Sequence, residues 1–197
     1  DEERINLPTK VEFTSVPGMS AEVNMISCGP FHNACIDATG VLYTWGNGGQ
    51  GRLGHGDRSS ESTPTRVKTF HQLGLRVVAV ACGRAHTLAI THNGAVYAWG
   101  CGLHGRLGNG SQRDAWSPIK ITFKEPSLLK TSEQFRRVAC GAFHSIVVTS
   151  EGRIAVWGCN RDGQLGIDPL EEKRTVEEGK EEVKSQTMVL IPTFLDK

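Results

Sequence analysis

Three stretches of the chain align with one another without a gap: 27–46, 81–100 and 139–158. Each contains Cys-Gly, a histidine and a final Trp-Gly, and a Leu-Gly pair follows at 53–54, 107–108 and 165–166. We name the shared glycines, histidines and tryptophans the repeat landmarks: Gly29, Gly83, Gly141, His32, His86, His144, Trp45, Trp99 and Trp157. The landmarks step by 54 and then by 58 residues, which indicates stacked copies of one supersecondary unit.

Within one unit the periodicity is typical of strands. VVAVAC (77–82) is a continuous apolar run, HTLAI (86–90) is short and β-rich, and AVYAWG (95–100) alternates. PIKIT (118–122) would be a fourth strand, with proline at its start and at the sheet edge. Four antiparallel strands in about 50 residues describe one propeller blade. We therefore predict an all-β fold, a β-propeller segment of about three four-stranded antiparallel blades.

A proline-led pattern helps to divide the chain. PTRV (64–67) and PIKI (118–121) match PTKV (8–11), and PTFL (192–195) is a looser copy. We expect 8–11 to be the last strand of a preceding unit, a spare N-terminal strand, within a single partial propeller over 1–197. The three units would cover about 12–67, 68–121 and 122–197. An acidic insertion at 167–190 has the composition of a frayed helix or a disordered flap.

The loops after the first two Trp-Gly pairs have the glycine spacing of a dinucleotide-binding loop. The third copy, WGCNRDGQLG (157–166), replaces one of these glycines with Asn160, which also tolerates a left-handed backbone. No helix is expected after Gly54 or Gly108 to bind a phosphate. We predict turn glycines and no cofactor.

Neither a metal site nor a catalytic residue is predicted. The six cysteines include no CxxC pair, and their spacing follows the repeat. Each landmark histidine is expected to begin a strand, to pack between blades and to hydrogen-bond a backbone carbonyl. No serine, cysteine or carboxylate stands beside a base at a spacing typical of nucleophilic or acid–base catalysis.

The repeats resemble those of the regulator of chromosome condensation (RCC1-like) family, whose loop pattern WGCNRDGQLG (157–166) fits in full. The resemblance implies blades of a ring that has about seven when complete. It also implies a protein–protein interaction scaffold without chemistry of its own. The alternatives are part of a guanine-nucleotide exchange factor for a Ran-type small GTPase with chromatin or histone association, and a targeting module of a ubiquitin ligase or kinase.

Charge and hydropathy limit the other partners. The formal net charge of +1 gives little support for direct nucleic-acid binding, and no apolar run is long enough to span a membrane. We expect an intracellular protein, nuclear or cytoplasmic. Three units cannot close a ring, so the remaining blades of a longer chain or a second copy would cover the open ends.

Residues that differ between units are the candidates for partner binding, because blades provide a frame and loops provide specificity. Phe31, Arg84 and Phe143 precede the landmark histidines at hairpin tips that should share one face. The following loops add His104, Trp116, Arg161 and Asp162. Trp116 matches no repeat position, and the sequence leaves open whether it is a plug or an exposed anchor.

Overall fold

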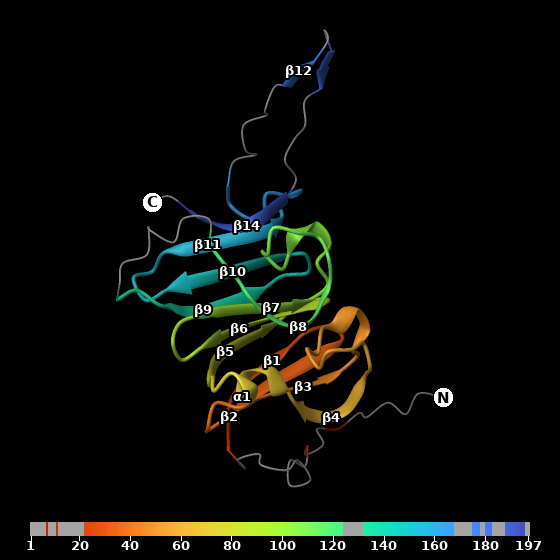
Figure 1. Cartoon of the computed structure of the whole chain (residues 1–197), viewed down its shortest axis with the longest axis vertical. Helices are drawn as coiled ribbons and strands as arrows, with labels where there is room; N and C mark the ends of the chain where they lie inside the picture. The colour runs from red at the N-terminus through yellow and green to blue at the C-terminus, as the bar shows by residue number, and fades with distance from the viewer. Residues whose placement is uncertain are drawn as a thin grey trace.

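The computed structural model describes residues 7, 11, 22–123, 132–167, 175–177, 180–182 and 188–195. These residues form three four-stranded antiparallel sheets, which follow one another along the long axis of the molecule (Figure 1). The predicted all-β propeller segment is confirmed. Most of the expected spare strand at 8–11 lies outside the described residues.

Each sheet is one blade, and its strands lie side by side in chain order. Blade 1 contains β1 (Val23–Cys28), β2 (His32–Asp37), β3 (Leu42–Gly46) and β4 (Glu61–Arg66). Blade 2 contains β5 (Val77–Cys82), β6 (His86–Thr91), β7 (Val96–Gly100) and β8 (Ala115–Lys120). Blade 3 contains β9 (Phe135–Cys140), β10 (His144–Thr149), β11 (Ile154–Cys159) and β14 (Met188–Phe194).

Burial differs between the middle blade and its neighbours. All six residues of β6 are buried, because blades 1 and 3 cover both faces of blade 2. In β10 of blade 3, buried and partly buried residues alternate, as a strand covered mainly on one face requires. The continuous apolar character of 77–82 and 86–90 therefore reflects a central position in the stack.

The hydrophobic core lies between blades. One cluster joins blades 1 and 2 and includes Ile36, Phe70 and Trp99. A second joins blades 2 and 3 and includes Leu88 and Trp157. Burial of such side chains stabilises by about 1.5–3 kcal/mol each, so each blade depends on its neighbour for much of its stability.

Three details differ from the sequence predictions. Pro64 and Pro118 lie inside β4 and β8, although both strands are at sheet edges as predicted. A short helix, α1 (Lys68–Gln72), was not expected; its buried Phe70 packs into the core between blades 1 and 2. Within the acidic insertion the described residues include a strand pair, β12 (Thr175–Glu177) with β13 (Lys180–Glu182), and no helix.

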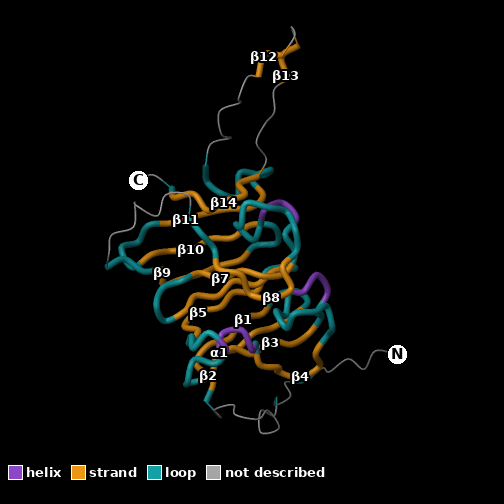
Figure 2. Tube along the Cα trace, in the orientation of Figure 1, coloured by secondary structure: helices purple, strands orange, loops and turns teal. Residues whose placement is uncertain are grey.

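Strands and turns make up nearly all of the described chain (Figure 2). The loops after the first two Trp-Gly pairs each contain a single 3-10 turn, η1 (Gly49–Gly51) and η2 (Leu103–Gly105). No helix begins within 55–60 or 109–114, as predicted. None of the described helices is long and apolar enough to cross a membrane.

Candidate interaction face

The first landmark histidine connects blade 1 to blade 2. His32 Nε2 lies 2.7 Å from Thr87 Oγ1, and that hydroxyl donates to the Arg52 carbonyl oxygen at 2.7 Å. Because the hydroxyl proton is used in this bond, His32 must donate from Nε2. Trp99 Nε1 donates to the same Arg52 carbonyl at 2.9 Å. One loop carbonyl of blade 1 thus accepts two hydrogen bonds from blade 2.

The same arrangement recurs between blades 2 and 3. His86 Nε2 lies 2.9 Å from Ser145 Oγ, and Ser145 Oγ and Trp157 Nε1 both donate to the Arg106 carbonyl at 2.8 Å. For His32 and His86, Nε2 faces a hydroxyl on the next blade rather than the expected backbone carbonyl. A hydroxyl can accept a hydrogen bond from the imidazole and donate one to the loop carbonyl, so a single small side chain connects the histidine to that carbonyl.

Burial keeps these imidazoles neutral. Burial, and then the Arg52 charge, lowers the pKa of His32 to about 4. Burial, and then Arg106, lowers the pKa of His86 to about 3. Among the described residues, no group of three His, Cys, Asp or Glu side chains is placed to hold a metal ion. The two histidines are placed to join blades.

The Leu-Gly glycines need the absence of a side chain. Gly54 and Gly108 have φ of +81° and +75°, and a Cβ on either would lie 2.7 Å from the indole nitrogen of Trp99 or Trp157. Behind each landmark histidine, the glycine of the Cys-Gly pair meets the imidazole ring; a Cβ on Gly83 would lie 2.5 Å from His86 Cε1. These glycines serve close packing between and within blades.

Two arginines in the loops after the first two Trp-Gly pairs are buried. The Arg52 and Arg106 side chains are 7% and 2% exposed. Arg52 donates to the Arg84 carbonyl at 3.1 Å, and Arg106 to the Ala142 carbonyl at 3.0 Å. Each guanidinium therefore fixes the hairpin tip of the next blade. Their shared position in the Gly-Arg-Leu-Gly loops was the sequence signal for this role.

Four of the seven candidate contact residues are connected through these arginines. The Arg52 guanidinium lies 5.4 Å from the Phe31 ring centroid. Arg84 and Arg106 lie 6.0 and 4.7 Å from the Phe143 ring, and His104 meets that ring edge-on at 5.4 Å. We name Phe31, Arg84, His104 and Phe143 the tip face. Phe31 is 49% exposed, so apolar and cationic groups alternate on an accessible surface.

Two further candidates, Arg161 and Asp162, lie in the loop after β11 of blade 3. The pKa of His104 is lowered by burial and then by the charges of Arg106 and Arg161. Arg161 therefore lies close enough to His104 to act on it electrostatically. Asp162 is exposed, and its backbone N–H binds the Gln164 side chain.

Trp116 lies on β8, apart from the tip face. Its Cα and ring stand where a Cβ on Gly51 would be, Arg58 stacks on the ring at 5.1 Å, and 43% of the side chain stays exposed. Leu190 takes the same place against Gly105 one blade later. Trp116 therefore covers the loop of the preceding blade, at a position that does repeat in the structure.

The model of the regulator of chromosome condensation (RCC1) repeat matches residues 39–90 and 93–148, and a second RCC1 repeat model matches 77–106 and 135–164. The chain is 36% identical over 152 residues to the ultraviolet-B receptor UVR8 of Arabidopsis thaliana, covering 77% of this chain and 33% of the receptor. It is 40% identical over 153 residues to the human E3 ubiquitin-protein ligase HERC2, covering 76% of this chain and 3% of the ligase.

Solved structures show the same fold. Human WBSCR16 superposes with a TM-score of 0.64 at 26% identity, over 88% of this chain and 39% of that one. Prp20p of Saccharomyces cerevisiae superposes with a TM-score of 0.67 at 24% identity, over 92% of this chain and 40% of that one, which shows the fold alone. The chain spans about a third of the receptor's length. It belongs to the regulator of chromosome condensation (RCC1) repeat family.

Proposed function

We propose that the chain is a protein-interaction module that uses the tip face to bind a partner. The observation that supports this is the row of Phe31, Arg84 and Phe143 held by buried arginines. Aromatic and arginine side chains are favoured at the centres of protein interfaces. Because Arg52 and Arg106 fix the backbone of the tips, little conformational entropy is lost when a partner binds.

The chemistry of the face indicates its partner. Arg84, Arg161 and the edge of His104 offer donors, while Phe31 and Leu103 are half exposed and apolar. A protein segment that carries carboxylates next to apolar side chains would complement it.

A photo-crosslinking amino acid placed at Phe31 or Phe143 tests the proposal, followed by identification of the crosslinked protein. The matched control is Ile154, which is 37% exposed at the start of β11, away from the tips. We expect a partner at both tip positions and none at Ile154. Phe31→Ala and Arg84→Ala should then each weaken binding of that purified partner by at least about tenfold, as interface anchors do. Equal crosslinking at Ile154 would contradict the proposal.

A second candidate is nucleotide exchange on a Ran-type GTPase. The fold is that of Prp20p, which has binding properties to Gsp1p and histones. Release of labelled GDP from a Ran-type GTPase measures this activity, and Phe31→Ala should slow the release if the tip face is used.

A third candidate function, targeting within a ubiquitin ligase, is supported by the similarity to a short part of HERC2. If the chain binds a Ran-type GTPase without accelerating GDP release, the exchange function is excluded and the protein-interaction module stands.

A further inference from the structure

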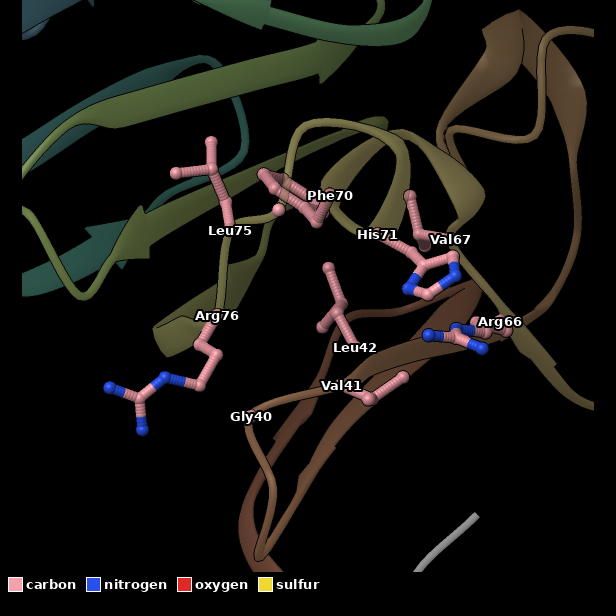
Figure 3. A pocket seen from close by; sticks show the side chains of 10 residues that line it. Gly40, Val41, Leu42, Arg66, Val67, Phe70, His71, Leu75 and Arg76 are labelled. Carbon is pink, nitrogen blue, oxygen red and sulfur yellow. The ribbon is translucent and has the colours of Figure 1, made fainter. Parts of the chain in front are cut away.

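A cavity of about 150 Å³ lies between blade 1 and the helix α1. Its lining comes from the β2–β3 turn, the end of β4, and the segment from α1 to β5, as Figure 3 shows. The cavity is at the opposite end of β2 from the tip face, since that strand begins beside Phe31 and ends at Asp37. It is therefore separate from the surface proposed above. We name it the α1 pocket.

The inner wall of the α1 pocket is apolar. Leu42, Val67 and Phe70 are almost fully buried, at 1%, 1% and 2% exposure. Val41 and Leu75 are partly buried and continue this wall outward. An apolar cavity of this volume is large enough to hold a benzene-sized group. The space fits one branched aliphatic or small aromatic group.

The two charged residues of the lining, Arg66 and Arg76, are both cationic. Arg66, His71 and Arg76 line the pocket, and no aspartate or glutamate does. In Figure 3 the Arg66 guanidinium lies beside the His71 ring, and Arg76 is on the other side of the cavity. The stem of Arg76 packs on Gly40, where an added Cβ would lie 2.8 Å from Arg76 Cβ. A ligand here meets cationic groups next to the apolar wall.

Arg66 has an unused donor at this place. Among the described residues its Nε is buried and has no hydrogen-bond partner. The carboxylate of Asp37, which accepts from the neighbouring Tyr43 hydroxyl, is already engaged by Thr39 and the Val41 N–H. A buried donor without a partner destabilises the folded chain, more so when it belongs to a charged group. Arg66 as a whole is only partly buried, so a small movement of its side chain would bring the guanidinium against a carboxylate in the pocket, and the two groups match in shape.

We propose that the α1 pocket binds an apolar carboxylate: an aliphatic group of about the size of a leucine side chain occupies the cavity, and its carboxylate meets Arg66 with His71 alongside. A free small acid and the C-terminal leucine of a peptide share this chemistry. The combination of a buried apolar inner wall with an arginine beside it distinguishes the pocket from a surface basic patch, which would bind any anion.

The first test uses amide chemical shifts of the whole chain with N-acetyl-leucine, N-acetyl-leucine amide, and a peptide that ends in a free-carboxyl leucine. We expect the acid at millimolar concentration to shift the Val41 and Leu75 amides, and the uncharged amide to shift them far less. Tighter binding of the peptide assigns the site to protein C-termini, and equal binding assigns it to free acids. Equal shifts with acid and amide, or none with either acid, would overturn the proposal.

The second test uses substitutions. Arg66→Gln should raise the Kd of N-acetyl-leucine at least tenfold, whereas Arg136→Gln, the same change at an exposed position on β9, should leave it within twofold. An equal loss in both variants would mean nonspecific attraction and would refute the site. If Arg66→Gln does not fold, the acid-against-amide comparison on the unaltered chain still decides. Because the tip face is not altered, its partner binding should be unchanged in Arg66→Gln.

Discussion

The inner interfaces between blades and the outer side of blade 3 carry the same landmarks in different surroundings. His86 is fully buried against Ser145, while His144, its counterpart in blade 3, is only partly buried. An added Cβ would meet Trp99 at Gly54, but at Gly166 it would meet nothing within 4 Å. The landmarks are therefore buried by a neighbouring blade and not by their own: the histidines by the next blade, and the tryptophans by the preceding one.

The largest test of this comparison concerns tryptophan. Trp99 is 0% exposed and bonded to the Arg52 carbonyl, whereas Trp45 is partly exposed on the outer side of blade 1. Trp99→Ala should lower the free energy of unfolding by about 4 kcal/mol, since it removes a buried ring. Trp45→Ala should cost about 1 kcal/mol. Urea unfolding of both variants measures the difference, and equal losses would contradict the account.

A glycine pair sharpens the comparison, because both members have positive φ. Gly54 has φ +81° and Gly166 has φ +65°, so alanine is strained at either position. Gly166→Ala should cost about 1 kcal/mol from the backbone alone. Gly54→Ala must also displace the Trp99 indole, and should cost about 3 kcal/mol in total. Thermal unfolding gives both values; a smaller loss at Gly54 would show that the indole moves freely.

The histidines predict a pH dependence of stability. The pKa of a histidine is about 6.5 in the unfolded chain, but about 4 for folded His32 and about 3 for folded His86. Below pH 6.5 the unfolded state binds more protons, so stability is fully present above that pH and is lost as pH falls toward 4 and 3. Between pH 7 and pH 5 each histidine should remove about 2 kcal/mol.

Urea unfolding at the two pH values measures this loss. His86→Leu should abolish its share of the pH dependence, while His144→Leu, at a partly buried site, should change the dependence less. A stability that stays constant from pH 7 to pH 5 would show that the imidazoles are solvated in the folded state.

Much of the fold could be predicted from the sequence, because the landmarks and the strand periodicity recur in register. The hydroxyl partner of the histidines could not be predicted. The residue that follows the landmark histidine in each blade is Asn33, Thr87 or Ser145, so no single residue type marks the position. The α1 helix was also missed, because one buried residue, Phe70, sets its place through tertiary packing.

The candidate site was predictable only in part. Phe31, Arg84 and Phe143 could be placed together, because each precedes a landmark histidine at the equivalent hairpin tip of its own blade. The role of Arg52 and Arg106 was not recognised, since an arginine in a polar loop normally suggests exposure. Trp116 seemed unpatterned, because its counterpart Leu190 differs in residue type.

A double-mutant cycle on His86 and Ser145 tests the central claim, that the landmarks join neighbouring blades, most directly. Urea unfolding of His86→Ala, Ser145→Ala and the double variant gives the coupling energy between the two side chains. We predict a coupling of about 1 kcal/mol, as for a buried hydrogen bond, and additive effects for His32→Ala with Ser145→Ala, which share no bond. Additive effects for His86 and Ser145 as well would contradict the claim.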